Sequence, residues 1–304
     1  MLPRATLVLL VAFCCACTPS EESHMKAIIG AALIDGSGGP PLSNSVVVVA
    51  DGRFREAGPF STVQIPSEAG KVDGSGKFLV PSLIDIYPKA ADGDEAFTPG
   101  HPATPDDARA QVARLAARHG SLLHIWKTDP AIAQATLEAA RDAGIRAAGH
   151  VSTQADARRL LDLGVDGFIG VFTDTEELDS SLVGKMSRLQ IFVAPQLVAA
   201  GLRLETAKRI THSLFAAGVP IAVASAGGSL SRETELLVDA GIPALDVIVA
   251  ATSHGAKALS QFDQTGSIQA GKRAGFLLLS ANPGEDIRNL NRVALRMTDG
   301  EWVH

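Results

Sequence analysis

The pattern of hydrophobic and polar positions changes twice along the chain. Residues 25–79 contain short runs rich in Val, Ile and Ala, separated by turn signals such as Gly-Gly-Pro-Pro at 38–41 and Asp-Gly at 51–52. Such runs are typical of β-strands that are joined by hairpins. Residues 265–304 return to the same pattern. We therefore predict that both ends of the chain build one small β-sandwich.

Between these ends, residues 80–264 alternate short apolar runs with amphipathic helical patterns. One predicted helix starts after Thr104, and another starts after Asp129 with Pro130 at its first position. Thr and Asp are good N-caps, and Pro is well tolerated at the first helical position. The alternation predicts parallel βα units, which close most naturally into a barrel.

The apolar runs provide about six barrel strands, whereas a complete TIM barrel has eight. These runs are residues 79–86, 121–127, 145–150, 167–172, 190–194 and 219–225. We therefore predict an α/β fold, with a truncated TIM-like barrel of about six strands over residues 80–264 and a composite β-sandwich from residues 25–79 and 265–304. If the barrel stays open, its free edge needs cover from the loop at 87–104 or from a second subunit.

The N-terminal segment is a separate unit. Arg4 precedes an apolar run, 5–16, that is too short to span the roughly 30 Å core of a bilayer as a helix. Residues 1–17 are therefore predicted to be an export signal, and residues 18–24 are predicted to be a polar tether.

All three cysteines, Cys14, Cys15 and Cys17, lie in this segment or at its end. The small residue Ala16 before Cys17 resembles the cleavage site of a bacterial lipoprotein signal. We predict that Cys17 carries lipid and anchors an exported protein to the cell envelope, facing the periplasm. The alternative is an ordinary cleaved signal peptide. Either way, no cysteine pair remains to form a disulfide in the folded part.

Composition narrows the class of partner. The net charge is -6, with acidic and basic residues interspersed, and only 5% of residues are aromatic. Nucleic-acid binding needs a basic surface and commonly uses aromatic platforms for bases. We therefore predict no nucleic-acid partner.

Several segments resemble, in order, the imidazolonepropionase-like and prolidase-like branch of the amidohydrolase superfamily. They are "LIDGSGGPPLSNSVVVVADGRFREAG", "GKFLVPSLID", "LDLGVDGFIG", "LLVDAGIPALDVIVAATSHGAKAL", "GSIQAGKRAGFLLLSANPGEDIRNL" and "DGEWV". The resemblance implies a distorted TIM barrel that hydrolyses non-peptide C–N or dipeptide bonds with one or two divalent metals. It also implies metal ligands at the ends of the barrel strands: a histidine pair, a carbamylated lysine, two single histidines and an aspartate.

Most of the implied ligand positions carry other residues. Tyr87 and Lys89 stand where the resemblance places the histidine pair, Gly170 stands at a single histidine, and Ala226 stands at the aspartate. Tyr87 is a poor ligand for this class of metal, and protonated Lys89 would repel a cation.

Two implied positions are retained, Lys127 and His150. A catalytic zinc needs about three protein ligands and an open position. His124 lies in the same predicted strand as Lys127, three residues away and therefore on the opposite face, so we expect it to give no further ligand. We predict no cofactor, and a divalent metal such as zinc only if the family activity survives.

Three functional hypotheses follow. In the first, the fold is kept, metal-dependent hydrolysis is lost, and the protein is a binding or scaffold lipoprotein with a small-molecule ligand at the barrel mouth. In the second, Tyr87, Lys89, Lys127 and His150 converge there and support altered or metal-independent catalysis. In the third, metal-dependent hydrolysis persists through ligands not identified in the sequence. The sequence leaves the oligomeric state open.

Overall fold

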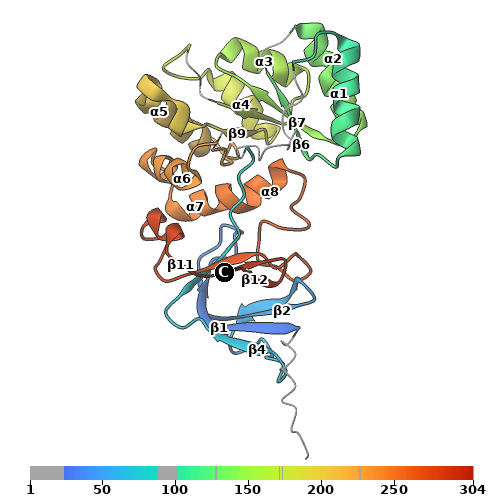
Figure 1. The fold of residues 1–304 in the computed structure, drawn as a ribbon. Coiled ribbons are helices and arrows are strands. Elements are labelled where there is room, and N and C mark those ends of the chain that lie inside the picture. The colour runs from blue at the N-terminus through green and yellow to red at the C-terminus, as the bar shows by residue number, and fades with distance from the viewer. Residues whose placement is uncertain are drawn as a thin grey trace, which may run out of the picture.

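The computed structural model describes residues 24–87, 101–126, 129–170, 172, 174–225 and 227–303. They form a helix-rich part and a part made mainly of strands (Figure 1). Among these residues, no helix combines the length and the apolar character that crossing a bilayer requires.

Strands from both ends of the chain form one eight-stranded sheet, in the order β12-β11-β10-β5-β1-β2-β3 with β4 paired to β1. The strands are β1 (Met25–Leu33), β2 (Leu42–Ala50), β3 (Arg53–Pro59), β4 (Gly70–Asp73), β5 (Phe78–Pro81), β10 (Phe276–Leu279), β11 (Val293–Thr298) and β12 (Glu301–Val303). The N-terminal and C-terminal strands join where β5 pairs with β10, with Leu79 opposite Leu278. This confirms the prediction that both chain ends build the β part of the fold.

The sheet folds over so that its two ends meet. The buried Lys26 amine donates a 2.7 Å hydrogen bond to the Gly300 carbonyl. A Cβ at Gly300 would lie 2.5 Å from the Gly52 Cα, so only glycine permits this close approach. The enclosed core contains Ile28, Phe276 and other apolar residues of both chain ends.

The second sheet is parallel, in the order β6-β7-β8-β9. Its strands are β6 (Leu122–Ile125), β7 (Arg146–His150), β8 (Gly167–Ile169) and β9 (Phe192–Ala194). Two less regular segments continue the wall: Ile221 forms a parallel bridge with Val193, and the Ile86 amide donates to the Val223 carbonyl at 3.0 Å. The wall thus contains about six segments, in agreement with the predicted truncated barrel.

The first predicted barrel strand, 79–86, is divided between the two sheets. Phe78–Pro81 forms β5 in the eight-stranded sheet, and the chain reaches the barrel only from Ile84 onward, where the Ile84 amide donates to the Ala251 carbonyl at 2.7 Å. The cause is competition for partners, because β1 and β10 occupy both edges of β5.

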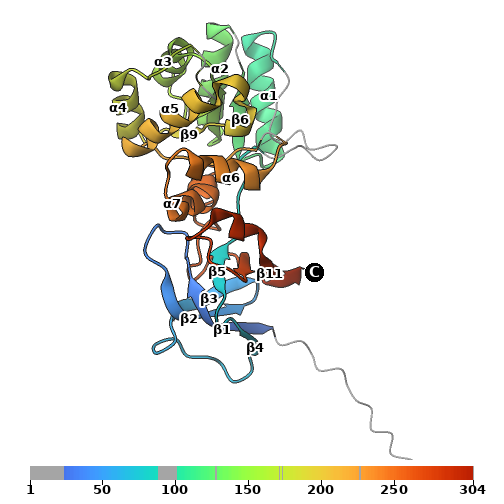
Figure 2. The same ribbon diagram turned by 90° about the vertical axis from the view of Figure 1, so that its left-hand side faces the viewer.

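Helices cover the outside of the barrel and separate it from the eight-stranded sheet (Figures 1 and 2). They are α1 (Pro105–Ala117), α2 (Pro130–Asp142), α3 (Gln154–Asp162), α4 (Ser180–Arg188), α5 (Leu204–Ala216), α6 (Leu230–Asp239), α7 (Ala244–Val249) and α8 (Gly255–Ala258). Thr104 and Asp129 cap α1 and α2, as predicted. A π-helical turn, Ala250–His254, connects α7 to α8 and was not predicted from the sequence.

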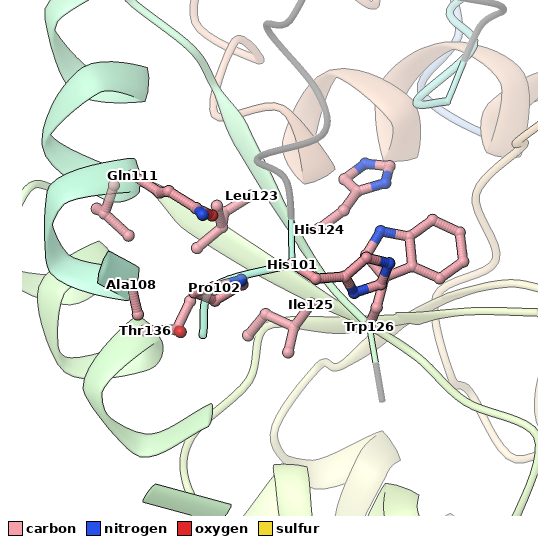
Figure 3. Close-up of a pocket in the computed structure, with 10 residues that line it drawn as sticks. His101, Pro102, Ala108, Gln111, Leu123, His124, Ile125, Trp126 and Thr136 are labelled. Atoms are coloured by element: carbon pink, nitrogen blue, oxygen red, sulfur yellow. The ribbon is translucent and has the colours of Figure 1, made fainter. Parts of the chain in front are cut away.

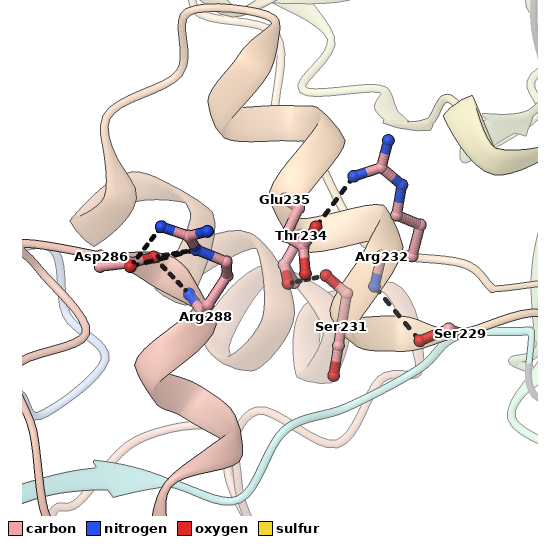
Figure 4. Close-up of polar contacts among 7 residues, drawn as sticks. All are labelled: Ser229, Ser231, Arg232, Thr234, Glu235, Asp286 and Arg288. Atoms are coloured by element: carbon pink, nitrogen blue, oxygen red, sulfur yellow. Dashed lines mark hydrogen bonds and ion pairs between the residues drawn. The ribbon is translucent and has the colours of Figure 1, made fainter.

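The C-terminal segment also contacts the helical part. The 3-10 helix η4 (Ile287–Asn291) lies against α6, and the Ser231 hydroxyl donates to the Asn291 side-chain oxygen at 2.6 Å. Asp286 caps η4 and pairs with Arg288, while Ser229 caps α6 (Figure 4).

The barrel interior is packed with side chains. Because side chains alternate along a strand, Arg146, Ala148 and His150 of β7 lie on one face. Most residues inside the wall are apolar and many are small: Ile86, Leu122, Ala148, Ile169, Phe192, Ala194, Ala222 and Ala224. We call the end of the barrel at His150 the mouth and the end at Arg146 the floor.

Candidate functional site

The mouth contains two histidines from neighbouring strands. His124 lies on β6 opposite Ala148 of β7, and His150 is the last residue of β7. The Nδ1 atom of His124 lies 3.1 Å from the Nε2 atom of His150, so one ring can donate a hydrogen bond to the other. The adjacency of β6 and β7 therefore creates an imidazole pair.

Two further aromatic residues complete what we call the mouth cluster, made of Tyr87, His124, Trp126 and His150. The Tyr87 ring centroid lies 4.6 Å from that of His124 and 5.4 Å from that of His150. The Trp126 ring stacks on His150 at 3.6 Å with an interplanar angle of 9°. The stacked indole shields one face of the His150 ring.

The cavity next to this cluster is small. It lies beside β6, is lined by His101, Gln111, Trp126 and neighbouring residues, and has a volume of about 20 Å³ (Figure 3). A space of this size holds about one water molecule. It cannot admit an organic ligand without movement of its walls.

Burial keeps both imidazoles neutral near pH 7. The low polarity around His124, together with the neighbouring His150 ring, lowers the pKa of His124 to about 3. Burial likewise lowers the pKa of His150 to about 4. Desolvation disfavours the charged form of a base, which accounts for both directions.

Asp85 is engaged in holding the wall together. Its Oδ1 atom accepts hydrogen bonds from the Tyr87 and Ser225 amides, both at 3.0 Å, and its Oδ2 atom accepts from the Ser225 hydroxyl. This carboxylate therefore joins the segment that enters the barrel to the segment after Val223. It positions Tyr87 beside the histidines.

A second carboxyl group, that of Glu233, holds the turn that follows β9. Glu233 on α6 is fully buried, and it accepts hydrogen bonds from the Leu197 amide at 2.7 Å and the Val198 amide at 2.9 Å. Burial raises the pKa of Glu233 to about 7, although the two N–H groups oppose this shift. The bonds fix the turn after β9, where Gln196 adopts a φ of 49°.

The structure brings together only part of the predicted site. Tyr87 and His150 meet at the mouth, whereas Lys89, Lys127 and Ala226 lie outside the described residues.

Gly170, where a histidine was implied, has a φ of 111°, and a Cβ there would lie 2.9 Å from the Val151 carbonyl oxygen. L-residues with a side chain rarely adopt such a φ. The present backbone at Gly170 therefore disfavours a histidine.

His124 and Trp126 were not predicted as site residues. The sequence held one usable signal, because residues 122, 124 and 126 share a strand face with a common parity. The neighbour of that strand depends on the tertiary structure, which the sequence pattern does not show. The expectation that His124 would add nothing to His150 considered only its own strand.

The described donor atoms of the mouth do not fit a catalytic zinc. Such an ion needs about three protein ligands from imidazole, thiolate or carboxylate groups. Within the described ranges, no group of three or more His, Cys, Asp or Glu residues could hold a metal ion. The imidazole pair alone falls short of this requirement.

Comparisons with known proteins agree with the architecture. The sequence model described as "Amidohydrolase family" matches residues 95–303. No curated protein sequence matches the chain.

Several solved structures share the fold. Molinate hydrolase has a TM-score of 0.79 at 15% identity, over 93% of this chain and 95% of that chain. A Xaa-Pro dipeptidase with bound methionine has a TM-score of 0.78 at 17% identity, over 92% and 100% of the two chains. The ochratoxinase of A. niger has a TM-score of 0.77 at 15% identity, over 92% and 96%. Identities this low support a common fold alone.

Proposed function

Because this chain belongs to the amidohydrolase family, we propose that it keeps the family fold, has lost metal-dependent hydrolysis, and acts as a binding or scaffold protein of the cell envelope. The observation that carries the proposal is the set of residues found at the mouth. Of the positions where the resemblance implies metal ligands, the described ones are Tyr87, His150 and Gly170. Only His150 is a metal-ligand type, and its neutral ring pairs with His124 beside Tyr87 and Trp126.

The chemistry of these groups supports this proposal. Two imidazoles could give a divalent ion two nitrogen ligands, and Tyr87 is a weak donor for such an ion. Asp85 already accepts three hydrogen bonds from Tyr87 and Ser225, so recruiting its carboxylate would break contacts of the barrel wall. Gly170 has a backbone conformation that disfavours a histidine.

The mouth cluster also suggests what could bind there. A small planar ligand that displaced Trp126 would find the exposed His150 ring and the Tyr87 edge. Neutral rings provide stacking surfaces and hydrogen-bond groups without fixed charge. This is the small-molecule role that we assign to the mouth.

The envelope location rests on the N-terminal sequence. The export signal with Cys17 and residues 18–23 of the tether lie outside the described residues. Intact-mass analysis of the mature protein tests this part. A diacylated or triacylated N-terminal cysteine at position 17 supports the anchor, and an unmodified mature N-terminus refutes it.

One observation favours a second candidate, an enzyme with altered or metal-independent chemistry. The Tyr87 ring lies against both imidazoles, and the predicted participants Lys89 and Lys127 are near these residues in sequence. The low basicity of the pair weighs against it, because a base with a pKa of about 4 removes protons poorly at pH 7.

Hydrolysis assays distinguish these proposals. The full chain and His150→Ala are incubated with Xaa-Pro dipeptides and N-acyl amino acids, in the presence of zinc, manganese or EDTA. We expect no turnover above the protein-free rate in any condition.

Metal-stimulated turnover that His150→Ala abolishes would overturn the proposal in favour of the family reaction. Turnover that resists EDTA but is lost in His150→Ala and Tyr87→Phe would establish the second candidate instead.

A further inference from the structure

The floor of the barrel contains a much larger cavity than the mouth. Its volume is about 570 Å³, and its lining includes Arg146, Phe192, His254, Lys257 and Phe262. Small-molecule sites in proteins commonly have volumes of about 300–1,000 Å³. The floor cavity is therefore large enough for an organic ligand.

This cavity is separate from the mouth. Arg146 begins β7 and His150 ends it, so the two residues mark opposite ends of the same strand. Phe192 likewise begins β9, and Lys257 lies on α8 beneath the barrel. The apolar interior, including Ala148 and Ile169, lies between the two ends.

Arg146 is a fixed, partly balanced cation at this site. Its Nη1 atom donates to the Lys257 carbonyl at 2.6 Å, and its Nε atom lies 3.3 Å from Oδ1 of Asp166. Its guanidinium also lies 5.2 Å from the centroid of the Phe192 ring. These contacts hold the guanidinium against one aromatic wall of the cavity.

Lys257 supplies a less balanced charge. Within the described part of the chain, no ion pair joins its exposed ammonium group to a carboxylate. The Nζ atom lies 4.9 Å from the centroid of Phe262, over the second aromatic wall. Asp263 also lines the cavity and offsets part of the positive charge.

Two further groups lie at or near the floor: the buried Lys272, which contacts the lining residue Phe262, and the half-buried His254, which lines the cavity. Lys272 is only 6% exposed, and its Nζ atom lies 3.5 Å from the Phe262 centroid and 2.7 Å from the Ser267 hydroxyl. His254 donates from Nδ1 to the Ile221 carbonyl at 2.8 Å, because that carbonyl can only accept. If the ring is neutral, Nε2 is then left as an acceptor; burial lowers the pKa of His254 and favours that form.

From this geometry we propose that the floor cavity binds a small aromatic monoanion, such as an aryl carboxylate. The carboxylate pairs with Lys257 near Arg146, and the ring of the ligand packs between Phe192 and Phe262. Aromatic walls with a few convergent polar groups are typical of ligand sites. This site does not depend on the function proposed for the mouth.

The test uses phenylacetate as the probe on the full chain, with binding measured by isothermal titration calorimetry and by ligand-observed NMR. Acetate retains the charge without the ring, and 2-phenylethylamine retains the ring with the opposite charge. We expect phenylacetate to bind with a Kd of about 1 mM or tighter, and both analogues to bind at least about tenfold more weakly.

Matched variants locate the binding. Lys257→Met should weaken phenylacetate binding about 2- to 5-fold, the scale of one exposed ion pair, and Lys257→Arg should restore most of it. Lys71→Met is the control, because Lys71 is an exposed lysine of β4 in the other sheet. It should bind phenylacetate like the unmodified chain.

Any of four results would overturn the proposal. Three are an absence of phenylacetate binding up to about 10 mM, equal binding of all three probes, and equal binding by Lys257→Met and the unmodified chain. The fourth is a loss of phenylacetate binding in His150→Ala. His150→Ala separates the two ends of the barrel. Retained binding in this variant supports the floor site, whereas its loss would place phenylacetate at the mouth.

Discussion

The two ends of the barrel interior differ in charge and in packing, although one strand connects them. At the mouth, His150 is a neutral ring held between Trp126 and His124, and the adjacent cavity measures about 20 Å³. At the floor, Arg146 and Lys257 line a cavity of about 570 Å³. Close packing removes charge from ionisable groups, whereas solvent access retains it. The comparison separates a closely packed end from an open, cationic end.

The largest effect is expected from Glu233→Ala, which tests how Glu233 supports the turn after β9. The change leaves the buried amide of Leu197 and the partly buried amide of Val198 without their acceptor. Each unsatisfied buried N–H costs about 1–3 kcal/mol, so we expect the free energy of unfolding to fall by about 3 kcal/mol. Chemical denaturation with urea measures this loss.

Glu235→Ala is the matched control. Glu235 lies on the same helix and pairs with Arg232 at 2.8 Å near the surface (Figure 4). Such pairs contribute about 0–1 kcal/mol. Equal losses in the two variants would contradict the role of Glu233 in supporting the turn after β9.

The next effect is a pH dependence caused by the imidazole pair. Well above pH 6.5 both rings are neutral in the folded and in the unfolded state. As the pH falls below 6.5, the unfolded chain takes up protons that folded His150 and His124 accept only near pH 4 and pH 3. The free energy of unfolding should therefore fall with decreasing pH in this window.

The His124 contribution is isolated by comparing the chain with His124→Phe. Glu233 has the opposite effect on the free energy of unfolding. Because its pKa is raised to about 7 in the folded state, the folded protein takes up a proton there before the unfolded chain does, which stabilises the fold as the pH falls. This contribution is common to both proteins and cancels in their difference. Between pH 6.5 and 5 we expect the unmodified chain to lose about 2 kcal/mol relative to the variant. If the two proteins have parallel pH profiles of stability, the pKa of His124 is not lowered in the folded state, which would contradict this prediction.

A smaller effect is expected from Gly170→Ala, which tests whether the mouth can regain a side chain at this position. The φ of 111° and the 2.9 Å approach to the Val151 carbonyl should cost about 1–2 kcal/mol.

Gly184→Ala in α4 is the control and should be neutral or stabilising by up to about 1 kcal/mol, because Gly184 lies inside a helix. Thermal unfolding of both variants gives the comparison. A neutral Gly170→Ala would show that the backbone accepts a side chain there.

Local patterns in the sequence were sufficient to predict most of the fold. Strand and helix periods, the caps at Thr104 and Asp129, and the β character of both chain ends agree with the structure. Residues 79–86 were predicted as one barrel strand, whereas the structure divides them between two parts of the fold. The sequence does not show that β5 pairs with β1 and β10.

The sites were less accessible to prediction. His124 meets His150 only because β6 lies beside β7, and the floor cavity requires Lys257 and Phe262 to meet Arg146 across long separations. Parity along a strand can be read from a sequence, whereas adjacency in space cannot. Comparing the sequence with the implied metal-ligand positions therefore identified which ligands are replaced. It did not reveal the imidazole pair of His124 and His150 at the mouth.

The central claim, that the mouth does not hold a catalytic metal, is tested most directly by measuring metal content. The protein is produced in zinc-supplemented medium and analysed for bound metal, and its thermal unfolding is then followed with added zinc. We predict far less than about one equivalent of zinc and an unchanged Tm, because a ligand specific for the folded state would raise the Tm. About one equivalent of zinc, with a rise in Tm that His150→Ala abolishes, would contradict the account.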